Sequence, residues 1–158
     1  MDKQYIQMML ESLQKKEQIL KELIKKSDEQ KDVLSAETVD WDAFDNITVD
    51  KGVLIDELLK LDEGFESLFE RVKGPLTEHK DMYKTEIGFM QATIRSLTEK
   101  STELEALEQR NKTMVETRVA ESRQSIKQSK LGSQAAIEYY QRMNKINVVD
   151  PQLMDKKS

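Results

Sequence analysis

The sequence predicts an all-α protein, an antiparallel helical coiled-coil bundle of three long helices with an extended C-terminal helical arm. Charged residues make up 35% of the 158 residues and hydrophobic residues 37%, with only five glycines and two prolines. Apolar side chains also recur at seven-residue intervals along most of the chain. This combination is typical of long helices with narrow apolar stripes and disfavours a sheet protein.

The first helix is expected over residues 2–34. Its main apolar series has a seven-residue period and consists of Ile6, Leu13, Leu20 and Leu34. Such a period places all of these side chains on one face of a helix. Ser27 and Lys31 lie in the same stripe, so the apolar contact is expected to weaken near the end of this helix.

The second helix is expected to begin after Asp40, whose carboxylate can accept the free backbone N–H groups of a first helical turn. Two heptad series follow, one of Phe44, Leu58, Phe65 and Val72, the other of Ile47, Leu54, Leu61 and Leu68. Lys51 is the one exception in the first series. The helix is expected to end at Gly74-Pro75, because proline breaks the hydrogen-bond ladder.

A third helix is expected over residues 76–130, about 80 Å long against about 50 Å for each of the first two. Beyond about residue 110 it therefore lacks a partner of matching length within the chain. Gly132 then permits a turn before a short amphipathic helix over residues 134–145. The chain is accordingly divided into an antiparallel bundle, residues 1–110, and a C-terminal arm, residues 111–158.

The charge distribution gives little support for nucleic-acid binding. The second helical region, residues 35–73, is strongly acidic, with 4 basic and 11 acidic residues. Residues 110–130 carry six basic and two acidic residues, but no aromatic side chains are interleaved with them. We interpret both regions as solvated helix surfaces and predict no nucleic-acid partner.

Catalytic and metal-binding motifs are lacking in the sequence. There is no cysteine, no glycine-rich phosphate loop and no nucleophile motif, and His79 is the only histidine. We therefore expect no enzyme activity, no cofactor and no metal site. No apolar run approaches the roughly 18 residues that a membrane span requires, and the absence of cysteine suits a reducing compartment. The sequence predicts a cytoplasmic protein without membrane insertion.

Apolar side chains of the arm are the candidate functional residues, because they lie beyond the part of the third helix that the first two helices are expected to cover. Exposed apolar patches usually mark interaction surfaces, and an amphipathic helix laid against another helix is a common mode. The predicted partner-binding residues are Met114, Val115, Val119, Ile126, Ile137, Tyr139, Tyr140, Met143, Ile146 and Met154. The alternative is that the arm packs on its own bundle or on a second copy of the chain.

Two stretches resemble a known family. Residues 50–69, "DKGVLIDELLKLDEGFESLF", are similar to the second helix of FlgN-type flagellar export chaperones, in which a lysine-containing "K-x-x-L-I-x-x-L" stretch leads to "L-D-x-x-F". The ending, from "EYYQRMN" to "MDKKS", resembles the C-terminal region of the same family. The order of two shorter helices, one long helix and a short amphipathic segment also resembles that family.

This resemblance implies a cytoplasmic flagellar type III export chaperone. Its partners would be the hook–filament junction proteins, whose amphipathic terminal helices it covers before secretion, and the export apparatus. In the family, partner binding maps to the C-terminal helical region, which corresponds here to the arm. The alternative function is a structural coiled-coil homo-oligomer whose arm pairs with itself.

Overall fold

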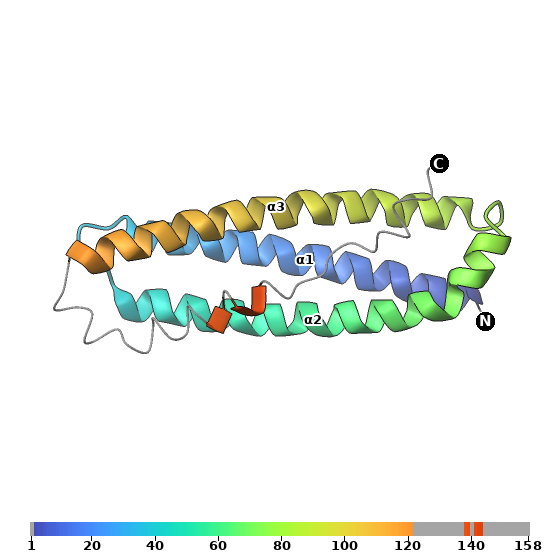
Figure 1. Ribbon diagram of the computed structural model, residues 1–158, viewed down its shortest axis with the longest axis horizontal. Coiled ribbons are helices and arrows are strands. Elements are labelled where there is room, and N and C mark those ends of the chain that lie inside the picture. The colour runs from blue at the N-terminus through green and yellow to red at the C-terminus, as the bar shows by residue number, and fades with distance from the viewer. Residues whose placement is uncertain (1, 122–137, 140, 144–158) are drawn as a thin grey trace.

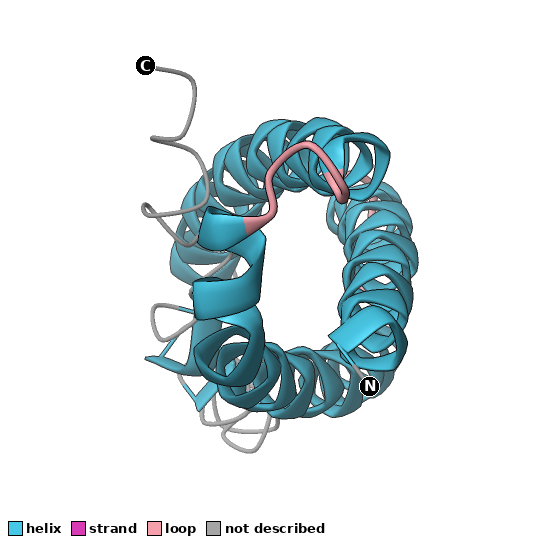
Figure 2. Ribbon diagram, turned by 90° about the vertical axis from the view of Figure 1, so that its right-hand side faces the viewer, coloured by secondary structure: helices cyan, strands magenta, loops and turns pink. Residues whose placement is uncertain are grey.

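The computed structural model describes residues 2–121, 138, 139 and 141–143. Three long helices, α1 (Asp2–Leu34), α2 (Trp41–Glu78) and α3 (Lys84–Glu121), pack side by side into a rod (Figure 1). Viewed along the rod, the helices surround a common centre (Figure 2). No strand occurs among the residues described. The prediction of an all-helical fold with three long helices is therefore confirmed.

Consecutive helices run in opposite directions along the rod (Figure 1). Contacts between α1 and α2 join the start of one helix to the end of the other. Arg71 donates a hydrogen bond of 2.7 Å to the hydroxyl of Tyr5 at one end, and Lys26 pairs with Asp50 at 3.7 Å towards the other. Between α1 and α3, by contrast, later residues of one helix contact later residues of the other, so these two helices run in the same direction. α1 thus packs against both of the other helices.

The start of α2 follows from a local capping interaction. The carboxylate of Asp40 accepts a hydrogen bond of 3.1 Å from the backbone N–H of Ala43, and the Asp40 backbone is extended. This is the arrangement that satisfies a free donor of a first helical turn. The predicted N-cap is confirmed.

The predicted end of α2 at Gly74-Pro75 is wrong, because the helix continues to Glu78. Pro75 removes one hydrogen bond from the ladder, but Val72 and Leu76 on either side of it are buried in the core. We attribute the continuation to this packing, which offsets the lost bond. The C-terminal end of α2 bends away from the axis of the rest of the helix (Figure 1), as proline commonly causes.

The later end of α2 shortens the expected third helix. α3 begins at Lys84 and not at residue 76, and its described part has 38 residues, the same number as α2. The two helices are therefore each about 57 Å long. Within residues 84–121 the large mismatch of helix lengths inferred from the sequence is absent.

The part of α3 that follows residue 110 has partners in the chain. The Asn111 side chain donates a hydrogen bond of 2.8 Å to the Ser27 carbonyl. Arg118 donates one of 2.8 Å to the Glu37 carbonyl in the connection between α1 and α2. The expectation that α3 lacks a partner beyond about residue 110 is therefore wrong for residues 111–118.

The apolar face of α2 differs in part from the predicted one. The first heptad series is buried as expected, and Lys51, its polar exception, is buried as well. Three of the four positions one residue later are buried instead, namely Thr48, Ile55 and Phe69, and Leu76 continues them at the same seven-residue interval. Asp62, which follows Leu61, is half-buried. The predicted residues are half-buried at the edge of the core, namely Ile47, Leu54, Leu61 and Leu68. A helix that contacts two neighbours buries a stripe wider than a coiled-coil seam. Both predicted series therefore contact the core, but the second is less buried than the first.

This difference predicts unequal losses on truncation. Ile55→Ala is expected to lower the free energy of unfolding by about 2–5 kcal/mol, because Ile55 is fully buried. Leu61→Ala should cost only about 1 kcal/mol, since part of its side chain already contacts solvent. Urea denaturation of the two variants measures both values, and equal losses would contradict this assignment of the buried face.

Candidate functional site

Six polar side chains occupy buried positions towards the end of the rod that holds the connection between α1 and α2. Two come from each helix, and none is more than 3% exposed. We call this set the polar layer: Ser27 and Gln30 of α1, Thr48 and Lys51 of α2, and Glu108 and Asn111 of α3. Buried polar groups are stable only when they are hydrogen-bonded, so the partners of this layer decide its role.

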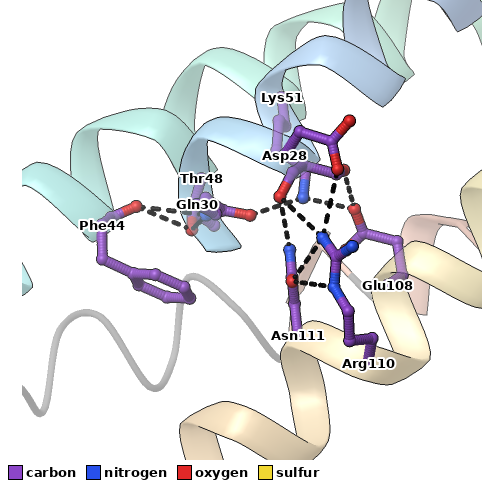
Figure 3. Close-up of polar contacts among 9 residues, drawn as sticks. Asp28, Gln30, Phe44, Thr48, Lys51, Glu108, Arg110 and Asn111 are labelled. Atoms are coloured by element: carbon purple, nitrogen blue, oxygen red, sulfur yellow. Dashed lines mark hydrogen bonds and ion pairs between the residues drawn. The ribbon is translucent and has the colours of Figure 1, made fainter. Parts of the chain in front are cut away.

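Lys51 lies at the centre of the polar layer and links all three helices (Figure 3). Its ammonium donates hydrogen bonds of 2.6 Å to Gln30 Oε1 and 2.5 Å to Glu108 Oε1. The Ser27 hydroxyl donates to the same Glu108 oxygen. A buried ion pair thus joins α2 to α3, with hydrogen bonds from α1 on both of its members.

Further hydrogen bonds extend the layer on either side of this ion pair (Figure 3). The Gln30 amide nitrogen donates to the Thr48 hydroxyl at 2.7 Å and to the Phe44 carbonyl at 3.2 Å. On the α3 side, Arg110 donates to Asn111 Oδ1 at 3.1 Å and to Asp28 at 3.3 Å. Arg110 and Asp28 are partly exposed, so they form the rim of the layer.

Burial changes the acidity of Lys51. Loss of hydration lowers the pKa of its ammonium below the ordinary value of 10.5, and the positive charge of Arg110 acts in the same direction. The carboxylate of Glu108 opposes this effect through its charge and its hydrogen bond. Burial is the largest contribution, so the net pKa of Lys51 is lowered.

A second buried ion pair lies farther along the rod. Lys16 of α1, which is 2% exposed, pairs with Asp62 of α2. The Lys16 ammonium also lies 5.8 Å from the centre of the Phe65 ring, within the range of a cation–π contact. This pair joins only α1 to α2, whereas the polar layer joins three helices.

Part of the arm closes over the polar layer. The Tyr139 side chain is 1% exposed, and the Lys51 ammonium lies 4.3 Å from the centre of its ring. Such a desolvated cation–π contact contributes about 2 kcal/mol. Met143 packs against the hydrophobic core. The described residues 138, 139 and 141–143 lie beside α2 (Figure 1).

An ion pair holds the same segment at its solvent-exposed edge. Arg142 Nη1 lies 2.9 and 3.0 Å from the two carboxylate oxygens of Asp56. Gly52, one turn before Asp56 on α2, makes this approach possible, because a Cβ placed there would overlap the Arg142 guanidinium. We call Tyr139, Arg142 and Met143 the latch.

The predicted partner-binding residues have different surroundings. Three of them are half-buried on α3, namely Met114, Val115 and Val119. Tyr139 is buried and Met143 is half-buried, both against the chain's own bundle. The remaining five lie outside the described residues: Ile126, Ile137, Tyr140, Ile146 and Met154. In this conformation, Tyr139 is not exposed to a partner.

Sequence reasoning did not recognise the polar layer, although each helix contained a signal. Lys51 interrupts a series of apolar residues, and Ser27 falls in the seven-residue repeat of α1. In α3, Asn111 follows Met90, Leu97 and Leu104 at the same spacing. In each helix, then, a polar residue replaces an apolar one in the seven-residue repeat. Three such replacements at the same height along the bundle would have indicated a shared polar layer.

Other surfaces of the rod carry weaker features. A groove of about 670 Å³ between α1 and α2 is lined by Ile19 and Leu61 together with charged and amide side chains. Exposed apolar side chains occur at Met82 and Phe89, near the turn between α2 and α3. Among the described residues, no three acidic or histidine side chains converge as a metal site would require. None of the described helices combines the length and hydropathy needed to cross a membrane.

Comparison with known proteins gives no relative. No family model matches the chain, and no match was found among curated proteins or solved structures. The features of the chain that bear on function are the polar layer, the arm and the sequence resemblance.

Replacing Lys51 tests the ion pair. Lys51→Met is expected to lower the free energy of unfolding by about 3–5 kcal/mol, because it leaves the Glu108 carboxylate buried without its cation. The double variant Lys51→Met/Glu108→Met should recover most of that loss, since no buried charge remains. Urea denaturation of both variants measures this, and equal losses would mean that the layer is held by packing alone.

The lowered pKa of Lys51 predicts a pH dependence of stability. Below 10.5 the unfolded chain binds more protons at this group than the folded chain, so the free energy of unfolding rises with pH. The contribution is fully present above 10.5 and is lost as the pH falls through the folded pKa. It is measured as the stability of wild type minus that of Lys51→Met/Glu108→Met, from about pH 8 to 11. A difference that stays constant over this range would contradict the lowered pKa.

Proposed function

We propose that the chain is a cytoplasmic flagellar type III export chaperone. It shields the amphipathic terminal helices of hook–filament junction proteins and delivers these subunits to the export apparatus. In this proposal the three helices form an antiparallel coiled-coil bundle, and the arm supplies the partner-binding residues. The resemblance of residues 50–69 and of the C-terminal region to FlgN-type chaperones supports this assignment.

The observation that carries the proposal is the contact of Tyr139 and Met143 with the bundle. Both side chains are buried or half-buried against helices, so this part of the arm has the chemistry for helix-to-helix contact. Tyrosine and methionine suit such surfaces, because tyrosine adds rigid contact area and methionine adapts to the shape of a partner.

The proposed partner has a physical need for such contact. A subunit that polymerises through amphipathic terminal helices exposes their apolar faces until it is assembled. Those faces associate prematurely unless another surface covers them. A helical arm that lays its apolar face on the subunit's helix removes that surface from water.

A second candidate function is a structural coiled-coil oligomer whose arm pairs with itself. The burial of Tyr139 against its own bundle bears on this alternative only in that this part of the arm packs without a foreign partner. Sedimentation equilibrium separates the two candidates. The chaperone is expected to bind a partner without needing a stable oligomer, whereas the structural protein forms a stable oligomer on its own.

Calorimetric titration tests the proposed partner. A peptide carrying the C-terminal helix of a hook–filament junction protein is titrated into the full-length protein. The triple variant Met114→Ala/Val119→Ala/Met143→Ala should bind more weakly by several kcal/mol, since buried anchors commonly lose about 2 kcal/mol each on truncation, without strict additivity.

The matched control removes apolar side chains elsewhere. Val49 and Val53 are 59% and 55% exposed on α2, so Val49→Ala/Val53→Ala should leave the affinity unchanged. Equal binding by the triple variant and the wild type would exclude these arm residues as anchors. Failure of the wild-type protein to bind the peptide would contradict the proposed function.

A further inference from the structure

The latch occupies side chains that the proposed function assigns to a partner. Tyr139 is buried against Lys51, and Met143 packs against the core. Neither side chain can cover a partner helix fully while it holds these contacts. The bundle and the partner therefore compete for the same residues.

The polar layer does not need the latch to satisfy its ion pair. Lys51 has hydrogen bonds to Gln30 and Glu108, and both of these residues belong to the long helices. When Tyr139 is released, Lys51 loses its contact with the tyrosine ring but keeps both of these hydrogen-bond acceptors. The bundle can thus keep its fold when the latch leaves.

The charged edge of the latch is suited to exchange. The side chains of Arg142 and Asp56 are 33% and 54% exposed. Water can therefore hydrate both charges when the ion pair separates. α2 offers the latch a small residue, Gly52, followed four positions later by a carboxylate, Asp56. On a helix, residues four apart lie on one face.

We infer that the latch is an autoinhibitory contact and that the partner's helix displaces α2 from it. The partner fitted to this role is an amphipathic helix with a small residue and, four positions later, an acidic residue at the edge of its apolar face. Such a helix offers Arg142 a carboxylate, and it offers Tyr139 and Met143 an apolar surface. This inference rests on the proposed function for the identity of the partner, but the intramolecular contact is testable without it.

The first experiment measures latch docking in the full-length protein alone. The chain has no cysteine, so Gln141→Cys and Lys73→Cys introduce two unique sites for spin labels on exposed positions. Electron–electron double resonance should give one narrow distance distribution. Asp56→Ala should broaden it, whereas Glu57→Ala, which removes the neighbouring exposed carboxylate, should not. The exchanged pair Asp56→Arg/Arg142→Asp should restore the narrow distribution.

The second experiment measures competition with two designed amphipathic helical peptides. They are identical except that one carries the small residue and an aspartate four positions later, and the other has lysine in place of the aspartate. The aspartate peptide should bind and broaden the distance distribution of the labelled protein. Asp56→Ala should tighten its binding about tenfold if the latch is docked in about nine molecules of ten. The lysine peptide should bind more weakly to both proteins.

The outcomes separate the two proposals. A narrow distribution that Asp56→Ala leaves unchanged would overturn the latch, as would peptide binding that neither moves the arm nor responds to Asp56→Ala. If the distances respond as expected but the junction-protein peptide does not bind, the proposed function fails and the intramolecular latch stands. An arm that docks on a second molecule would give a distribution that changes when labelled protein is diluted with unlabelled protein, which also overturns the latch.

Discussion

The burial of the Lys51 ammonium is the constraint on which the arrangement of the three helices depends. A buried cation needs acceptors, and here they come from two other helices at once, Gln30 on α1 and Glu108 on α3. Apolar heptads tolerate a shift by seven residues because one leucine replaces another. If α3 moved by one heptad, Ser101 would take the level of Glu108 and Lys51 would lose its carboxylate. The polar layer therefore fixes which levels of the helices meet.

Much of the fold was predictable because its causes are local. The extent of α1 and the cap at Asp40 follow from short-range sequence patterns, and the structure agrees with both. The break at Pro75 was predicted wrongly, since the local effect of proline is offset by packing that only the folded chain supplies. On α2, an apolar residue follows Phe44, Leu58 and Phe65 at three positions, which predicted that series to be buried. Thr48 and Phe69, four positions after Phe44 and Phe65, are instead the more buried, because the position of the neighbouring helices decides which side chains are covered.

The polar layer and the latch could not be found by the same reasoning, because neither has a local signature. Ser27, Lys51 and Glu108 are far apart in the sequence and become neighbours only when the register of all three helices is known. From the sequence Tyr139 looks like an exposed anchor for a partner, yet it is buried against the hydrophobic core with its ring beside the Lys51 ammonium. Gly52 is equally ordinary in sequence, and its meaning comes from the Arg142 side chain that lies against it.

The uneven distribution of polar residues along the rod gives its two ends different cohesion. Towards the turn between α2 and α3 the interior is built from Phe69, Val72, Leu76, Tyr83 and Met90, which bury large apolar surfaces. At the polar layer, directional bonds replace much of that surface, and such a network is worth more intact than the sum of its separate bonds. We therefore expect local opening to begin at the end with the polar layer and not at the apolar end. The three helices would then separate first at the polar layer, while the apolar contacts at the other end hold them together.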